Sequence, residues 1–576
     1  GSRYPLKLTA SYFQHGQNIY DDEGNLVKNV GGDPHIMQTP GDDNFYIPSA
    51  SALEIRQGQV NASGNSGILL DGKLNVNGGT VDMSGGDNYI EYSSSGNAMI
   101  DVSSGSMTVG SQIRRKTTTK EGILNYSQSG GTVVVAENSA PEDDRGVFEI
   151  MNSGSNFELT GGELYIANAQ NNPSIASLYL DPASSNFTPG GKIVLGHSST
   201  GNNQTIGINS NISIPKLFVD DVSGNSPEVK MRVRELTVTD SLNIGAGTSF
   251  DTDGLNLRME GDFIAEGSYF ANGNKTYFEG NTDQEITGKT QFYDLYKTSS
   301  DSLFLNDSIT VNNVFRLEDG VLHDRGNNLA VKGNIYNNGI HVWGDLGDGI
   351  LANGSENQEI TGNGTYGKLS VNNVEGLTIP VVGNNIYIND ALQMENGVLD
   401  IGKNLLELDS NAVIVEKSAF SDNNMVQTNI SFTDAGIRKY FPKIEKDTTF
   451  TYPLGSGGKY TPVVFDIDSS LQHGYIRVKA ANERHPSIQE DSESPCELKD
   501  SLNVLQYHWL IEAQDISGFD ANVSMYADKE DIWVNNSCGY TTAEYITARL
   551  LENSVLWNKF DPFSFDESAS RLDFKF

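Results

Sequence analysis

The sequence predicts an all-β protein: a parallel, right-handed β-helix solenoid followed by an antiparallel, β-sandwich-like C-terminal domain. Three observations lead to this fold class. Glycine followed by alternating apolar residues returns at steps of about 26 residues, one stretch recurs at an offset of 74 residues, and helical signals are nearly absent. With 60 glycines, 17 prolines and 37% hydrophobic residues, the composition favours an ordered β protein over a disordered chain.

The chain divides into four predicted parts. These are an N-terminal cap (residues 1–45), a β-helix with coils of about 26 residues (46–200), a continuation of the β-helix in long repeats of about 74–77 residues (201–415), and a β-sandwich-like domain (416–576). A cap is expected because the first coil of a solenoid would otherwise leave an open strand edge.

The first coils are marked by glycines at a regular step. Gly79, Gly105 and Gly131 are 26 residues apart (105 − 79 and 131 − 105), and Gly162 and Gly191 follow at steps of 31 and 29. A short apolar strand follows each glycine, and alternate side chains of a strand point to opposite faces. We expect two inward columns, Val81, Met107, Val133, Leu164, Ile193 and Met83, Val109, Val135, Ile166, Leu195, with Asp82, Thr108, Val134, Tyr165 and Val194 pointing outward.

Two further sets of short apolar strands precede these. The first set is Ile68–Leu70, Ile90–Tyr92, Phe148–Ile150 and Leu178–Leu180, and the second is Leu74–Val76, Ile100–Val102, Leu124–Tyr126 and Phe157–Leu159. Three strands in about 26 residues are typical of one coil of a parallel β-helix, with glycine at the sharp bends. A stack of such coils predicts a rod.

A longer repeat organises the region from 201 to 415. Its first copy contains Gly280, Gln284, Ile286 and Gly288, and its second contains Gly354, Gln358, Ile360 and Gly362, an offset of 74 residues (354 − 280). Farther along, Leu317, Gly320 and Leu322 recur as Met394, Gly397 and Leu399, an offset of 77 (394 − 317). Because 77 residues are close to three coils of 26, we expect three coils in each long repeat.

Beyond residue 416 the strands become longer and the turns tighter. The segments Thr449–Gly455 and Tyr460–Ile467 indicate two strands joined by a glycine-rich turn. Tyr475–Lys479, Tyr507–Ile511 and Ala521–Tyr526 continue in the same style. This pattern predicts an antiparallel β-sandwich-like domain.

The charge balance excludes several classes of partner. The formal net charge is −36, from 75 acidic and 39 basic residues, and such a field repels nucleic acid and anionic membranes. No window is long and apolar enough for a membrane span. The acidic excess fits a solvated extracellular surface, or one on which some carboxylates bind Ca²⁺. We expect a monomer.

Part of the sequence resembles a known family. The run Gln358-Glu359-Ile360-Thr361-Gly362 with Gly397-Val398-Leu399, followed by Tyr452-Pro453-Leu454-Gly455 and Tyr460-Thr461-Pro462-Val463, resembles the repeat regions of large secreted surface proteins of Bacteroidota. Those proteins are associated with the type IX secretion system and look like adhesins. The resemblance covers about residues 200–470. It implies secretion, a cell-surface location and an adhesive or stalk function.

Two features are candidates for ligand binding. The basic cluster Arg114, Arg115 and Lys116 lies in a predicted long corner loop, where it could grip an anionic glycan or neutralise neighbouring acidic loops. Tyr165, on the outward column, could stack on a sugar ring or serve only in packing, because aromatic residues favour strands in any case.

Metal and catalytic motifs are sparse. Asp251 and Asp253 begin an alternation of oxygen ligands typical of a Ca²⁺ loop, but the later ligands of that motif are missing. The eight histidines are scattered singly, which argues against zinc. Carboxylates on the other faces are spread over two strand sets and assemble no catalytic groove: Glu91, Asp101, Glu149 and Glu158.

The two cysteines both lie in the last 81 residues (576 − 496 + 1). In an exported protein we expect Cys496 and Cys538 to form one disulfide, and two free buried thiols are the alternative.

These features favour a non-catalytic, secreted adhesin or stalk module that contacts glycans or a surface partner. The alternative is a polysaccharide lyase or glycoside hydrolase, because parallel β-helices also carry such enzymes. Such an enzyme would be recognised by three or more stacked acidic side chains with a basic partner in a groove. Ca²⁺ is the one cofactor that the sequence suggests.

Overall fold

The computed structural model describes residues 6–8, 18–20, 26–29 and 45–576, apart from 64–66, 95, 120, 139–142, 189, 221, 429–434, 489–502, 535, 552–553 and 555. The chain forms two compact units, Gly1–Leu295 (unit 1) and Tyr296–Phe576 (unit 2). The predicted fold class is confirmed, since the chain folds as a parallel β-solenoid of about 16 turns with an antiparallel C-terminal part. Among the described residues, no helix is long and apolar enough to cross a membrane.

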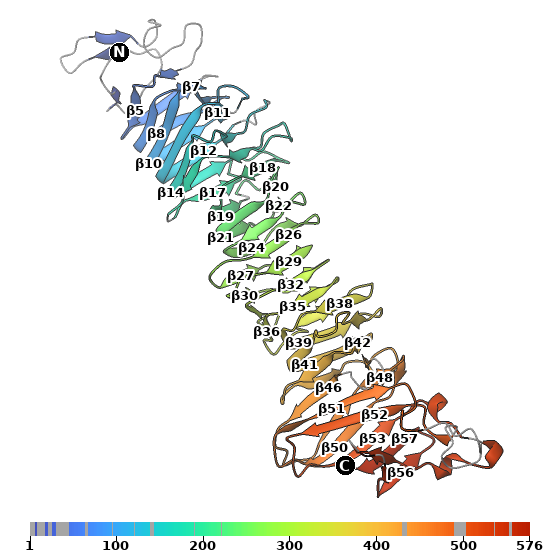
Figure 1. The fold of residues 1–576 in the computed structure, drawn as a ribbon. Coiled ribbons are helices and arrows are strands. Elements are labelled where there is room, and N and C mark those ends of the chain that lie inside the picture. The colour runs from blue at the N-terminus through green and yellow to red at the C-terminus, as the bar shows by residue number, and fades with distance from the viewer. Residues whose placement is uncertain are drawn as a thin grey trace. The chain divides into compact units, whose positions relative to one another are not determined.

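Two parallel sheets build unit 1 (Figure 1). The ten-stranded sheet contains β4 (Phe45–Ile47), β7 (Gly67–Leu70), β9 (Tyr89–Tyr92), β11 (Ile113–Arg115), β13 (Phe148–Ile150), β15 (Leu178–Leu180), β18 (Thr205–Ser210), β20 (Glu228–Met231), β22 (Ser249–Asp251) and β25 (Ser268–Phe270). The second, which we call the long-strand sheet, contains in unit 1 β1 (Leu6–Leu8), β5 (Ala52–Ile55), β6 (Gln59–Ser63), β8 (Lys73–Gly85), β10 (Asn97–Val109), β12 (Ile123–Val135), β14 (Asn156–Ile166), β16 (Ser184–Asn186), β17 (Lys192–Leu195), β19 (Ile214–Val219), β21 (Leu236–Ile244), β23 (Leu257–Met259), β24 (Asp262–Ala265), β26 (Lys275–Phe278), β27 (Gln284–Thr287) and β28 (Gln291–Phe292). A separate antiparallel pair joins β2 (Asn18–Tyr20) to β3 (Leu26–Asn29).

The inward columns of unit 1 are confirmed. Val81, Met107, Val133 and Leu164 pair on successive rungs of β8, β10, β12 and β14, and all four are fully buried. The structure differs from the prediction in two respects. Val134 and Val194 of the predicted outward column are buried, at 5% and 1% exposed, and the two strand sets expected in this sheet are joined. Each of β8, β10 and β12 is a single strand of 13 residues.

The bend in these long strands falls at the glycines of the 26-residue step. Gly105, Gly131 and Gly162 have φ values of +83°, +70° and +75°, in the left-handed region that favours glycine. The coils also approach closely there. A Cβ added to Gly131 would lie 2.5 Å from the carbonyl oxygen of Gly105 in the preceding coil.

A buried glutamine explains the 74-residue repeat. The Gln284 side chain accepts the Gly280 N–H through Oε1 (3.0 Å) and donates through Nε2 to the carbonyls of Met259 (3.0 Å) and Gly261 (2.8 Å). It therefore ties its own coil to the coil before it. In unit 2, Gln358 makes the equivalent bonds to Gly354, Val331 and Gly333.

Replacing this glutamine tests its role as a tie between coils. We expect Gln284→Leu to lower the free energy of unfolding by about 2 kcal/mol, because it removes the hydrogen-bond partner of the buried Gly280 N–H and of the half-buried Gly261 carbonyl, while the Met259 carbonyl still accepts the Glu279 N–H. Urea denaturation followed by circular dichroism measures the change. Gln291→Leu is the control, since Gln291 is exposed and its variant should match the wild type. Equal stability of both variants would contradict the assignment.

Unit 2 also contains a parallel solenoid. Strand β29 (Asp294–Lys297) contains the boundary between the units, and the parallel strands that follow are β30 (Ser302–Leu305), β31 (Ile309–Val311), β32 (Phe315–Leu317), β33 (Val321–His323), β34 (Leu329–Val331), β35 (Ile335–Asn337), β36 (Ile340–Val342), β37 (Ile350–Ala352), β38 (Gln358–Thr361), β39 (Thr365–Asn372), β40 (Leu377–Thr378), β41 (Ile386–Asn396), β42 (Leu399–Gly402), β43 (Leu405–Leu408), β44 (Val413–Glu416) and β45 (Val426–Thr428). The last parallel pairing joins β45 to β48 (Leu454–Ser456), which is antiparallel to β49 (Lys459–Tyr460).

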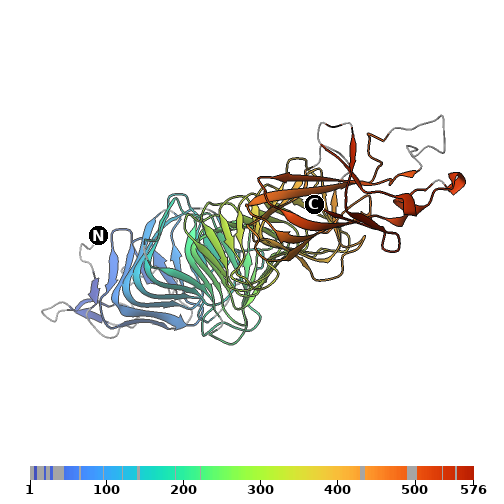
Figure 2. The ribbon, with the colours of Figure 1, turned by 90° about the horizontal axis from the view of Figure 1, so that it is seen from below.

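The C-terminal domain of unit 2 is mainly antiparallel. One layer pairs β46 (Gly436–Phe441), β51 (Gly474–Ala481) and β52 (His508–Gln514), and the other is β47 (Thr448–Tyr452), β50 (Val463–Ser469), β53 (Asp520–Tyr526), β57 (Arg571–Lys575) and β56 (Phe563–Asp566). The other edge of β46 is parallel to β43. Figure 2 shows these strands in orange and red. Aromatic side chains join the two layers. The ring centroids of Phe441 and Phe450 are 5.6 Å apart, and the Tyr452 hydroxyl donates a hydrogen bond to the Ile476 carbonyl. The short elements beside them are β54 (Ala548–Leu550), β55 (Trp557–Lys559), η2 (Lys529–Asp531), η3 (Asn536–Cys538) and η4 (Thr542–Glu544).

Candidate functional site

The largest gathering of charged side chains around a predicted site residue lies on the ten-stranded sheet of unit 1. Glu91 of β9 pairs in register with Arg114 of β11, and Glu149 of β13 occupies the next rung. These side chains point to the face opposite the buried Ile90, Ile113 and Phe148. The predicted corner loop for Arg114 and Arg115 is therefore wrong: Ile113 fills a rung of the apolar column, so both arginines belong to a strand.

Arg114 is held by two carboxylates and a ring. Its Nε lies 3.2 Å from Glu91 Oε2, its Nη1 lies 3.1 Å from Asp143 Oδ2, and its guanidinium stacks 4.0 Å from the Tyr89 ring centroid. Burial, followed by the positive charge of Arg145, lowers the pKa of Arg114 below its ordinary value. The side chain is mostly covered, so it presents little surface to an anionic ligand.

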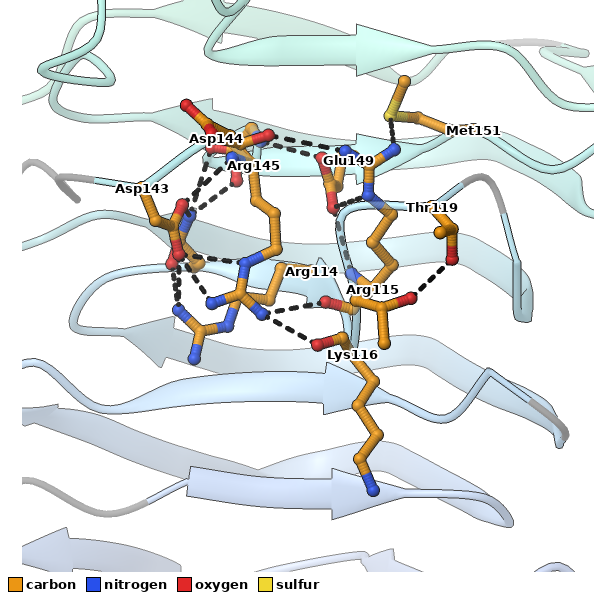
Figure 3. A network of polar contacts seen from close by, with 12 residues as sticks. Arg114, Arg115, Lys116, Thr119, Asp143, Asp144, Arg145, Glu149 and Met151 are labelled. Carbon is orange, nitrogen blue, oxygen red and sulfur yellow. Dashed lines mark hydrogen bonds and ion pairs between the residues drawn. The ribbon is translucent and has the colours of Figure 1, made fainter.

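Arg145 ties the segment that follows β12 onto this sheet (Figure 3). Its Nη2 lies 2.6 Å from Asp143 Oδ2 and its Nη1 lies 3.2 Å from Glu91 Oε2. The same Nη1 donates to the backbone carbonyls of Arg115 (3.1 Å) and Lys116 (3.2 Å). Asp143 also accepts from Gln112 Nε2 at 3.0 Å. The network therefore clamps the segment around residues 143–146 over β11.

Arg115 and Glu149 form the buried part of the network. Their side chains are 6% and 1% exposed, with Nε and Oε1 3.2 Å apart. Glu149 also accepts the backbone N–H groups of Arg115 (3.1 Å) and Gly146 (2.8 Å). Burial raises the pKa of Glu149, and the charge of Arg115 opposes that rise.

The arrangement balances its own charge. The guanidinium groups of Arg114, Arg115 and Arg145 form ion pairs with the carboxylates of Glu91, Asp143 and Glu149. A general acid or base must reach a substrate, and a carboxylate that is 1% exposed does not. The geometry therefore suits a structural clamp better than acid–base chemistry. Of the predicted cluster, Lys116 alone is exposed.

Tyr165 is not brought together with the basic cluster, because it belongs to β14 of the long-strand sheet. Its hydroxyl donates to Glu163 Oε2 (2.5 Å), and its ring contacts His197 edge-on at 5.1 Å. Burial, followed by the hydrogen bond to Glu163, raises the pKa of Tyr165. A role in stacking on sugar stays a prediction, and the observed contacts fit packing.

Asp251 and Asp253 lie at the end of β22 among cations. Lys230 Nζ lies 2.8 Å from Asp253 Oδ1 and 3.2 Å from Asp251 Oδ2, and Arg232 Nη1 lies 3.5 Å from Asp253 Oδ2. The hydrogen bond to Asp253 is the main cause that raises the pKa of Lys230. Within the described residues, no group of three or more His, Cys, Asp or Glu side chains could hold a metal ion. The Ca²⁺ role stays a prediction without support from this geometry.

The predicted disulfide is untested, because Cys496 lies outside the described residues. Cys538 is the last residue of η3 in the C-terminal domain.

Sequence reasoning missed Asp143, Arg145 and Gln112 as parts of the site. A signal was present, because the step from Gly131 to Gly162 is 31 residues instead of 26 and marks an insertion in that coil. The insertion carries the charged run Asp143-Asp144-Arg145. Which side chains that run would meet depends on the coil stacking, which the spacing alone does not specify.

In comparisons with known proteins, the chain matches no family model, no curated protein and no solved structure.

Proposed function

We propose that the protein is a non-catalytic stalk or adhesin module, exported to a cell surface, that contacts glycans or a surface partner. The main observation behind this proposal is that the charged groups best placed for chemistry are already paired with one another. Arg114, Arg115 and Arg145 pair with carboxylates of the same coils, and Asp251 and Asp253 pair with Lys230. Such pairs hold coils and loops together.

The outward face of the long-strand sheet supports a binding role. Asn125 Nδ2 donates to Asn97 Oδ1 (2.7 Å) and Asn156 Nδ2 donates to Asn125 Oδ1 (2.9 Å), forming a ladder along the rungs. Ser103 and Asn77 form a similar contact at 2.8 Å. Repeated polar groups at a fixed spacing suit a multivalent ligand, because linked weak contacts add to avidity.

The cellular setting rests on the sequence. The resemblance between residues 200 and 470 and the repeat regions of Bacteroidota surface proteins supports secretion by the type IX system and a cell-surface location. The net charge of −36 is compatible with a soluble extracellular surface.

A polysaccharide lyase or hydrolase is the second candidate. It is favoured by one observation, that Glu91 and Glu149 of the ten-stranded sheet gather with Asp143 of the overlying segment beside three arginines. Stacked carboxylates with a basic partner are the groups that such enzymes use. Their mutual pairing and burial argue for the structural role.

Native affinity electrophoresis separates the two candidates. The protein is run through gels cast with neutral or anionic polysaccharides, with and without Ca²⁺, and the gels are then stained for polymer. We expect slower migration in at least one gel and no loss of polymer, with heat-unfolded protein as control. A cleared zone along the protein track would overturn the proposal and turn attention to Glu91, Asp143 and Glu149.

A further inference from the structure

A large cleft opens in the C-terminal domain of unit 2, on described residues between His485 and Phe576. Its volume is about 2110 Å³. Small-molecule sites usually measure roughly 300–1,000 Å³, so the cleft has room for several linked rings.

Aromatic side chains form part of its wall, beside aliphatic residues such as Leu505, Ile532 and Leu556. Tyr507, Trp509, Tyr540, Tyr545, Trp557 and Phe560 line it. Trp557 is 40% exposed, and its ring meets the His485 ring edge-on with the ring centroids 5.0 Å apart. Trp509 donates its indole N–H to the Thr461 carbonyl (3.0 Å), so the polar end of that ring is already bound within the domain.

The polar groups of the wall carry almost no net charge. Threonine hydroxyls and the imidazoles of His485 and His508 interrupt the aromatic surface, and Arg549 and Glu567 are the charged side chains of the described lining. Burial lowers the pKa of both histidines, which favours the neutral imidazole. A nearly neutral wall stands out in a chain whose net charge is −36.

We propose that this cleft binds a neutral oligosaccharide. Sugar rings have apolar faces that pack on aromatic side chains and hydroxyl edges that bond to threonine and neutral histidine. An anionic glycan would meet the repulsive field of the chain and only one arginine, and an acyl chain would bury the wall's polar groups without partners. This inference rests on the proposed adhesin function, and it names the class of ligand that the adhesin would bind.

Calorimetric titration of the full chain with neutral hexasaccharides of glucose and of mannose tests this, with an alginate hexasaccharide and laurate as comparators. We expect a neutral hexasaccharide to bind and Trp557→Ala to weaken it at least about tenfold. Trp533→Ala is the matched control, because Trp533 is 45% exposed in the same domain but does not line the cleft. Its affinity should stay within about twofold of the wild type.

The outcomes separate this inference from the proposed function. Equal affinity of the wild type and Trp557→Ala for a neutral hexasaccharide would place glycan binding elsewhere, overturning the cleft assignment while the adhesin proposal stands. Binding of alginate or laurate alone, or of no ligand in this set, would also overturn the cleft assignment. Polymer loss in the affinity gels would instead overturn the proposed function.

Discussion

Gly131→Ala is expected to lower the free energy of unfolding by about 3 kcal/mol. Two costs add at this position. The φ of +70° is unfavourable for alanine by about 1–2 kcal/mol. The new Cβ would also lie 2.5 Å from the Gly105 carbonyl oxygen, and that atom belongs to the backbone of the preceding coil and cannot rotate away. Overpacking of this kind costs a further 1–3 kcal/mol or so.

Gly224→Ala separates the two costs. Gly224 has almost the same φ, +71°, but a Cβ there would meet nothing within 4 Å. We expect this variant to lose only the conformational term of about 1–2 kcal/mol. Urea denaturation gives both values, and hydrogen exchange should show faster opening of β10 and β12 in Gly131→Ala. Equal losses in the two variants would show that close approach of the coils does not constrain this corner.

Arg115→Met is expected to lower the free energy of unfolding by about 3–5 kcal/mol, because it leaves the Glu149 carboxylate buried without its cation. Glu149 is 1% exposed and keeps only backbone N–H partners in the variant. Its pKa should rise further, so the loss should be largest at high pH and smaller where the carboxyl group is protonated. Urea denaturation across a range of pH measures both effects.

A double-mutant cycle checks that the loss comes from the pair. Adding Glu149→Gln to Arg115→Met removes the unpaired charge, so the double variant should be more stable than the sum of the single losses predicts, by about 1–3 kcal/mol. Arg56→Met is the control, because the ion pair between Arg56 and Glu54 lies on the surface of the same unit and should contribute nothing measurable. Additive losses would mean that Arg115 and Glu149 act independently.

The candidate site shows where prediction from sequence succeeds and where it stops. The sequence identifies Arg114, Arg115 and Lys116 as a cluster. One of its two predicted roles, neutralising acidic neighbours, agrees with the contacts of Arg114 to Glu91 and Asp143. Its placement in a loop was wrong. The pattern Ile113-Arg114-Arg115 is too short to distinguish a three-residue strand from a turn, and only pairing with β9 and β13 decides it.

The sequence by itself determined the inward columns of the first coils. Its glycine steps and apolar alternation specify that Val81, Met107 and Val133 share a column, because side-chain direction in a strand depends only on local geometry. It did not determine the length of the later coils. Leu303, Leu322 and His341 share a column at steps of 19 residues (322 − 303 and 341 − 322), so the expected three coils of 26 residues in each long repeat are wrong. The tertiary structure decided what each outward group meets. Arg145 lies 54 residues after Glu91 in the chain, yet their side chains touch because an insertion folds back over β11. Contacts of that kind depend on loop conformation and on the stacking of coils, neither of which follows from a local repeat.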